Sequence, residues 1–214
     1  LLAQSARCIR LTGYAGSGKT TTMKALAAKW SPQDIMWCAP CNSSRGILAQ
    51  KIPAEVITVA SALGLRPSVR QGRECFLPSG RNKINERFSK GWGRTLLVID
   101  ESSMLSSETL GWLMDSNASQ ALFVGDPAQI PPVGEPVSPI YSDKLNLPIY
   151  HLSKIFRQSE GSAIIPLASD IREYGLDTTA EHGIPSIYIS EETVREFYTT
   201  YPDGIAVCPT HVLK

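Results

Sequence analysis

The segment GYAGSGKT, from Gly13 to Thr20, constrains the fold of this chain more than any other part of its sequence. It fits the pattern G-x-x-x-x-G-K-[ST], follows an apolar segment, CIRLTG, and precedes a helical-looking one, TTMKALAAKW. In that strand–loop–helix context the glycines let backbone N–H groups surround a phosphate, and the helix start adds its positive end. The four fixed positions coincide by chance in well under about 1% of chains this long. The sequence therefore predicts a nucleotide-binding α/β domain.

We expect the loop and the first helical residues to bind the nucleotide together. Lys19 is expected to reach the β- and γ-phosphates, and the hydroxyl of Thr20 to bind Mg²⁺. The full set of expected nucleotide contacts is Gly13, Tyr14, Ala15, Gly16, Ser17, Gly18, Lys19, Thr20 and Thr21.

An acidic pair follows a second apolar segment. In TLLVIDESSM the four residues 96–99 bring Asp100 and Glu101 to a strand end. We expect Asp100 to hold the Mg²⁺ shell and Glu101 to act as the general base for a water. An activated water indicates hydrolysis, because a nucleotide kinase transfers phosphate to another substrate. The alternative is a solvated acidic turn that arose independently of the loop.

The segment ALFVGDPAQIPPVG is a third apolar strand followed by a stiffened loop. Ligands of open α/β sheets sit at the carboxyl ends of strands, so Gln129 is expected beside the γ-phosphate and the attacking water. Asp126 is expected to orient the loop. Pro131 and Pro132 restrict the backbone beyond it, so we interpret the segment as a γ-phosphate sensor.

Apolar and helical-looking segments alternate along the first 126 residues. This alternation predicts an α/β fold with a parallel sheet covered by helices on both faces. Residues 66–93 interrupt it with prolines and glycines and predict an insertion, a hairpin centred on SVRQGRECFLP. The expected strands are 8–13, 34–40, 56–61, 95–101 and 121–126, and the expected helices 21–30, 44–52 and 107–116; after Leu152 we expect helix, strand, helix, strand, in SAIIPLASDIREYG, PSIYIS, SEETVREFYTTY and GIAVC.

Charge is uneven along the chain. Residues 66–94 hold eight basic side chains against two acidic ones, in a chain of net charge +1. The excess suggests a polyanionic partner, although a solvated surface insertion would look similar.

Five scattered cysteines indicate reduced thiols in an intracellular compartment. Cys38 and Cys41 form a C-x-x-C, which is typical of a redox pair or of half a zinc site. No second ligand pair follows, so we favour a strand end and a loop. No apolar run approaches the roughly 20 residues that span a bilayer, and the amino terminus does not resemble a signal peptide.

In this order, the segments resemble superfamily 1 helicases of the 5′-to-3′ branch, which includes the phage Dda and RecD-like enzymes. The resemblance rests on GYAGSGKT, CAPCNSSRGIL, VITVASALG, VIDESSM, GDPAQIPPVG and IFRQSEGSAIIPLASDIR. It implies a P-loop, RecA-like first domain over residues 1–150, with an inserted pin domain at about 66–92. Residues 151–214 would begin a second RecA-like domain, truncated here. It also implies ATP with Mg²⁺ as cofactors, and unwinding coupled to ATP hydrolysis.

The resemblance also implies roles for single residues. Arg157 in IFRQ would be an arginine finger, and so a catalytic residue with Lys19, Asp100, Glu101 and Gln129. Phe76 and Trp92 would stack on bases; the alternative for each is local packing. The residues expected to contact nucleic acid are Pro40, Cys41, Asn42, Thr58, Ser61, Phe76, Pro209, Thr210 and His211.

The chain departs from the family at several positions. Cys41 stands where relatives often carry Thr, and Ala60 where they usually carry His. The amino-terminal glutamine motif and the later motifs of the second domain are missing from the sequence. This chain alone is therefore expected to bind nucleotide, hydrolyse it slowly and unwind nothing.

The expected partners are single-stranded DNA and a DNA fork, together with single-strand-binding or replication and repair proteins, and no membrane. We expect a monomer in the cytoplasm, which would be the host cytoplasm for a phage protein. Two alternatives stay open. One is an RNA-directed helicase of the same superfamily. The other is a regulatory P-loop module that binds nucleotide without productive turnover.

Overall fold

The structure is a computed structural model that describes residues 8–70, 72–88, 95–142 and 145–156. The chain divides into two compact units, Leu1–Ser159 and Glu160–Lys214, and the described residues all belong to the first. Residues 157–214 of the predicted second domain, which include Arg157 and residues 209–211, lie outside the described residues, as does Trp92.

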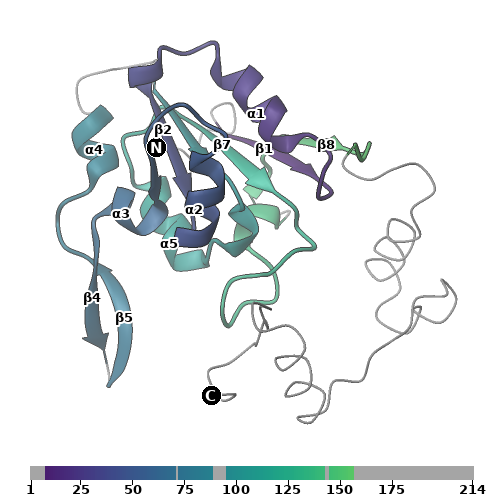
Figure 1. Cartoon of the computed structure of the whole chain (residues 1–214). Helices are drawn as coiled ribbons and strands as arrows, with labels where there is room; N and C mark the ends of the chain where they lie inside the picture. Colours follow the sequence, from purple (N-terminus) through teal and green to yellow (C-terminus); the bar gives the residue numbers. More distant parts are fainter. Residues whose placement is uncertain (1–7, 71, 89–94, 143–144, 157–214) are drawn as a thin grey trace, which may run out of the picture. The chain divides into compact units, whose positions relative to one another are not determined.

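A parallel sheet forms the centre of the first unit (Figure 1). Its six strands stand in the order β3-β2-β6-β7-β1-β8, and every pairing between them is parallel. Their carboxyl ends therefore meet at one edge, where ligands of such sheets bind. The strands are β1 (Cys8–Gly13), β2 (Ile35–Ala39), β3 (Val56–Thr58), β6 (Leu96–Ile99), β7 (Gln120–Gly125) and β8 (Ile149–Leu152).

Helices pack on both faces of this sheet, as the alternation of segments predicted. Side chains alternate across a strand, so Leu122 of β7 contributes to the core under α1 and α2, and Phe123 to the core under α3, α4 and α5. The helices are α1 (Lys19–Ala27), α2 (Asn42–Ala49), α3 (Val59–Leu63), α4 (Lys83–Phe88) and α5 (Ser107–Met114), with 3₁₀ turns η2 (Pro32–Asp34), η3 (Ser102–Met104) and η4 (Pro139–Tyr141). None of the described helices is long and apolar enough to cross a membrane.

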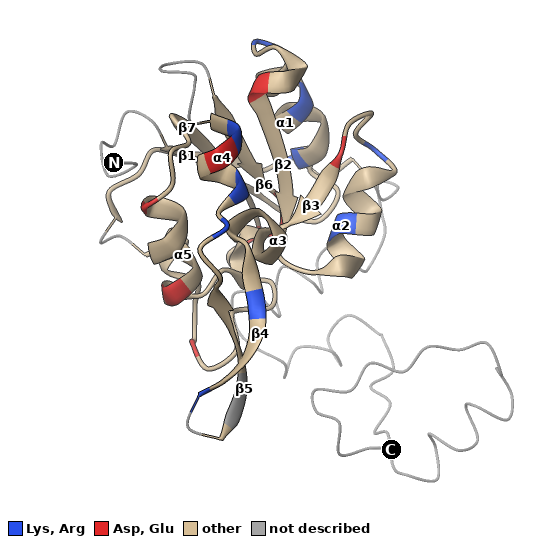
Figure 2. Cartoon of the chain, turned by 90° about the vertical axis from the view of Figure 1, so that its left-hand side faces the viewer, with Lys and Arg blue, Asp and Glu red and all other residues tan. Residues whose placement is uncertain are grey.

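The predicted hairpin is present. It is formed by the antiparallel strands β4 (Leu65–Arg70) and β5 (Arg73–Pro78) and projects from the sheet domain (Figure 1). Gly72 turns the chain between the strands with a φ of 74°. At the base, the amide and hydroxyl of Ser79 both donate to the Gly64 carbonyl. Arg66 and Arg70 of β4 are exposed, and Figure 2 shows basic positions along this hairpin.

Three features differ from the sequence expectations, and one of them is α4, a helix that was not predicted within the insertion. The predicted strand 56–61 ends at Thr58, because the Thr58 hydroxyl accepts a hydrogen bond from the Ser61 amide at 3.1 Å and so caps α3. The strand prediction for residues 59–61 was wrong. The structure also contains β8, which was not predicted, and this strand runs across the expected domain division at residue 150.

The C-x-x-C pair lies partly in the core. Cys38 is fully buried in β2, and burial raises the pKa of its thiol to about 12. Cys41 precedes α2, where its amide donates to the Ser44 hydroxyl at 3.3 Å. Within the described residues no group of three or more His, Cys, Asp and Glu side chains could hold a metal ion. These positions support the interpretation as a strand end and a loop.

Candidate functional site

The phosphate-binding loop lies where the sequence places it, between β1 and α1. Gly16 and Gly18 adopt left-handed backbone angles, with φ of 80° and 85°, and Gly18 is the residue before the first helical one. Such angles are costly for residues with a Cβ. The glycines therefore let the loop curl over the start of α1, where the unpaired backbone N–H groups attract a phosphate.

The Lys19 ammonium is held inside this loop. Its Nζ donates to the carbonyl oxygens of Gly13 at 2.7 Å and Tyr14 at 2.9 Å. These bonds fix the position of the charge, so a nucleotide would meet a cation that is already oriented.

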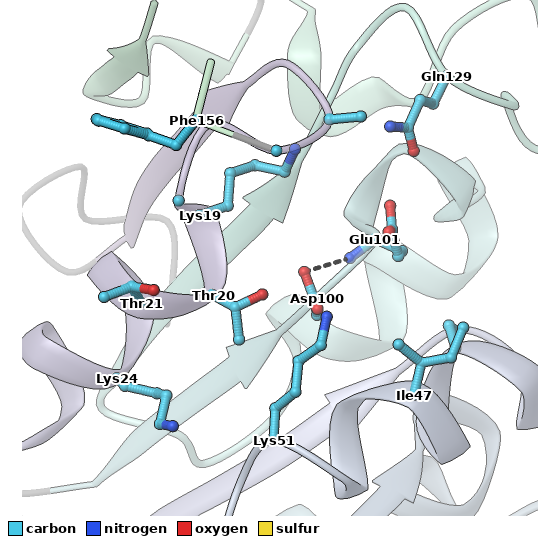
Figure 3. Close-up of a pocket in the computed structure, with 14 residues that line it drawn as sticks. Lys19, Thr20, Thr21, Lys24, Ile47, Lys51, Asp100, Glu101, Gln129 and Phe156 are labelled. Atoms are coloured by element: carbon cyan, nitrogen blue, oxygen red, sulfur yellow. Dashed lines mark hydrogen bonds between the residues drawn. The ribbon is translucent and has the colours of Figure 1, made fainter. Parts of the chain in front are cut away.

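A cavity of about 670 Å³ opens in front of the loop (Figure 3). It brings together residues from the P-loop, from α1 and α2, and from the ends of β6 and β7. The residues that line it are Ala15, Gly16, Gly18, Lys19, Thr20, Thr21, Lys24, Ser44, Ile47, Lys51, Asp100, Glu101, Gln129 and Phe156. Four of the five residues expected to be catalytic therefore share one cavity; Arg157 lies outside the described residues.

The expected nucleotide contacts divide into three groups. Six of them line the cavity: Ala15, Gly16, Gly18, Lys19, Thr20 and Thr21. Gly13 and Tyr14 contribute the carbonyls that hold Lys19, whereas Ser17 is buried and is not among the lining residues.

Asp100 and Glu101 directly follow β6 and line the cavity. Burial raises the pKa of Asp100, and burial followed by repulsion from Asp100 raises the pKa of Glu101. The amide of Glu101 donates to Asp100 Oδ1 at 3.1 Å (Figure 3). Glu101 itself has a φ of 51°, one of two described non-glycine residues with a positive φ. Such strained conformations are enriched at functional sites.

The loop after β7 is ordered by Asp126. This side chain is buried, and its Oδ1 accepts a hydrogen bond from the Ala128 amide at 3.1 Å. The Asp126 carbonyl accepts from the Gln129 amide at 3.0 Å, and the Gln129 side chain lines the cavity. The structure thus confirms that Asp126 orients the loop.

The donor set at the cavity fits a magnesium ion bound to nucleotide phosphates. Thr20 and Asp100 both line it, and in Figure 3 their side chains lie on the same side of it. Mg²⁺ is usually held by one or two protein oxygens, with waters and phosphate oxygens completing the shell.

Most residues of the first unit that we expect to contact single-stranded nucleic acid lie at the carboxyl ends of two neighbouring β-strands. Pro40, Cys41 and Asn42 follow β2, and Ala39 of β2 pairs with Thr58 of β3. Ser61 lies one helical turn beyond Thr58, with an exposed side chain. Phe76 lies apart from them on β5, 55% exposed.

Sequence reasoning missed several residues of the cavity. Lys51 follows α2 and reaches toward Asp100 (Figure 3), and its charge lowers the pKa of both carboxyl groups. Ser44 and Ile47 lie on the same side of α2, and their spacing from Lys51 was the only available signal. Phe156 also lines the cavity, and its amide donates to the Gly16 carbonyl at 2.9 Å.

Comparisons with known proteins identify the family of this chain. Residues 1–184 match the family described as AAA domain. The ATP-dependent RecD2 DNA helicase of Deinococcus radiodurans is 28% identical over 166 residues, which cover 76% of this chain and 21% of that protein.

Two solved structures share the fold. Pif1 of Bacteroides sp in complex with ADP-AlF4 is 26% identical, with a TM-score of 0.52 over 83% of this chain and 45% of that one. A structure from work on unwinding at forked double-stranded DNA by two coordinating Pif1 helicases is 26% identical, with a TM-score of 0.55 over 82% of this chain and 46% of that one. The chain thus spans less than half the length of each of these three proteins.

The family match includes the P-loop, the acidic pair and the Gln129 loop, which together line the cavity. The chain belongs to the AAA domain family, among the superfamily 1 helicases that resemble RecD2 and Pif1.

Proposed function

We propose that this chain is the ATP-binding part of a DNA helicase, which couples ATP hydrolysis to 5′-to-3′ movement along single-stranded DNA. One observation carries the proposal: Lys19, the Asp100–Glu101 pair and Gln129 line a single cavity. A phosphate-binding loop alone would fit many nucleotide-binding proteins. A general base and a polar amide on the same cavity add what hydrolysis requires.

Each residue of the site has a defined task in this proposal. Lys19 binds the β- and γ-phosphates, while Thr20 and Asp100 hold Mg²⁺, which neutralises phosphate charge when bound. Glu101 accepts a proton from the attacking water, and its raised pKa brings it closer to the operating pH of a general base. Gln129 orients that water through its amide.

DNA is proposed as the polymer because of the relatives. RecD2 is a DNA helicase by its name, and one Pif1 structure concerns forked double-stranded DNA. Residues 40–42, Thr58 and Ser61 would contact the strand backbone, and the hairpin with Phe76 would meet the fork. Backbone contacts would make binding tolerant of sequence and sensitive to salt. Neither the RNA-directed alternative nor the regulatory module is favoured by these relatives.

Location and further partners remain predictions. The described cysteines Cys38, Cys41 and Cys75 are thiols outside any disulfide, which supports a reducing compartment such as the cytoplasm. Action as a monomer and interaction with single-strand-binding or repair proteins are proposed from family resemblance alone.

The first test is ATP hydrolysis by the full-length protein, with and without single-stranded DNA. We expect strong stimulation by DNA, weaker stimulation by RNA, and loss of turnover in Lys19→Ala and Glu101→Gln. Lys29→Ala removes an exposed lysine just beyond α1 and serves as the matched control. Nucleotide binding without DNA-stimulated turnover would contradict the motor and favour the regulatory module. Equal or greater stimulation by RNA would favour the RNA-directed helicase.

A further inference from the structure

Tyr141 is not among the residues that line the cavity. It nevertheless connects the loop after β6, which carries Asp100 and Glu101, to the end of β7. Its hydroxyl lies 2.7 Å from Ser102 Oγ, and Ser102 Oγ donates to the Val124 carbonyl at 2.9 Å. A serine hydroxyl has one proton. Because that proton is given to Val124, the Tyr141 hydroxyl must be the donor to Ser102. The result is a directed chain from Tyr141 through Ser102 to the backbone of β7.

The packing at Gly125 leaves no room for a Cβ beside these two hydroxyls. A Cβ built on Gly125 would lie 2.5 Å from the Tyr141 hydroxyl and 3.1 Å from Ser102 Oγ. Only a glycine lets the two hydroxyls approach the strand end so closely. Ser102 itself is fully buried, so its hydrogen bonds stand without competition from water.

The anchored residues are direct neighbours of the chemical ones. Ser102 follows Glu101, whose left-handed backbone needs a fixed residue on its carboxyl side. Gly125 precedes Asp126, which orders the loop that presents Gln129. One hydrogen-bond chain therefore holds the two loops that present the general base and the water-orienting amide.

Tyr141 is suited to act as a permanent donor. Burial raises the pKa of its hydroxyl to about 12, and the negative charges of Asp126, Glu101 and Asp100 act in the same direction. The phenol therefore keeps its proton throughout the neutral pH range.

We propose that Tyr141 is a positioning residue for hydrolysis, which fixes Glu101 relative to Gln129 through Ser102. The inference rests on the proposed function, since it assumes that Glu101 activates water at this cavity. Tyr141 lies in η4 and does not line the cavity, so its proposed effect on hydrolysis is indirect.

The test is Tyr141→Phe in the full-length protein, which keeps the ring and removes only the donor. With saturating single-stranded DNA we expect kcat for ATP hydrolysis to fall by about tenfold or more, and KM for ATP to stay within about twofold. Tyr150→Phe removes a hydroxyl from a side chain that is 59% exposed on β8, and should change neither value.

A second variant separates positioning from simple loss of stability. Because Tyr141 and Ser102 act in one chain, Tyr141→Phe with Ser102→Ala should lower kcat no further than the more damaging single change. An unchanged kcat well below the melting temperature would overturn the inference, even if the melting temperature falls. Independent, multiplying losses would also overturn it. Lys19→Ala in the same assay tests the proposed function: if that variant retains turnover, both proposals fail.

Discussion

Glu101 combines a chemical requirement with a backbone conformation that favours glycine. A φ of 51° costs a residue with a Cβ about 1–2 kcal/mol relative to the right-handed region. The strain places the carboxylate on the cavity directly after Asp100. At the scale of one residue, stability and activity therefore make opposite demands on position 101.

Replacing this residue should separate the two demands. We expect the free energy of unfolding of Glu101→Gly to exceed that of Glu101→Gln by about 1 kcal/mol, because glycine relieves the backbone strain. The melting temperature of Glu101→Gly should be higher as well. Both variants should lose hydrolysis, since neither has a general base. Thermal and urea unfolding would measure the difference. Equal stability of the two variants would show that the left-handed angle is not strained.

Asp100 makes stability depend on pH in the absence of nucleotide and metal. Its folded-state pKa is raised by burial, so the folded protein binds a proton more readily than the unfolded chain. The stability from this group is therefore present at low pH. It is lost as pH rises above the ordinary carboxyl value of about 4 and through the raised one.

Asp100→Asn should remove this dependence because asparagine stays neutral. We expect the variant to gain stability relative to the unchanged protein as pH rises from about 4 to 7. Urea unfolding at several pH values, with a chelator present, would measure it. Asp115→Asn, at an exposed position after α5, is the control. A gain that shrinks as pH rises would contradict the assignment.

At the scale of elements, the sequence predicted the strands that come from continuous apolar segments. The apolar segment CIRLTG is β1 itself, and the ends of β2, β6 and β7 lie within about two residues of their predicted limits. These strands are buried on both faces, so their patterns are continuous and easily recognised. The P-loop and the acidic pair could be predicted because their chemistry requires particular residues in sequence.

Short elements and tertiary contacts could not be predicted in the same way. The five residues of α3 depend on a cap from Thr58, and the four of β8 depend on pairing with β1. Lys51 and Tyr141 lie far in sequence from the motifs of the site. The spacing of Lys51 from Ser44 and Ile47 is the only local signal for the first, and no local pattern indicates the second. Their contributions follow from the packing of the whole domain.

The hairpin β4–β5 offers a test at this scale. Phe76 is 55% exposed on it, so Phe76→Ala should leave the melting temperature nearly unchanged. If the hairpin meets the fork, loss of a stacking side chain should slow unwinding of a tailed duplex by several-fold, or about 1 kcal/mol, while DNA-stimulated ATP hydrolysis persists. Ile149→Ala truncates an apolar side chain of similar exposure, 50%, on β8 and is the control. Unchanged unwinding by Phe76→Ala would remove this residue from the proposed fork contact.

At the scale of the whole molecule, the P-loop is connected to the segment that leads out of the first unit. The Phe156 amide donates to the Gly16 carbonyl at 2.9 Å, and Phe156 lines the cavity. The next residue in sequence is Arg157, the expected arginine finger. A change in the backbone position of the P-loop on nucleotide binding would therefore be transmitted through this hydrogen bond to Phe156, the residue before this arginine.

Arg157→Ala should accordingly affect turnover far more than binding. An arginine finger contributes about 10³–10⁵ to the rate of phosphate hydrolysis, because it stabilises charge that develops in the transition state. We expect kcat of the full-length protein to fall by about 10³, with ATP affinity changed by less than about tenfold. Arg157→Lys keeps the charge but loses the planar, forked donor geometry, so it should recover only part of the rate. Single-turnover hydrolysis beside equilibrium nucleotide binding separates the two quantities. Equal losses in affinity and rate would instead make Arg157 a ground-state nucleotide contact, and full activity would place the catalytic arginine elsewhere in the protein.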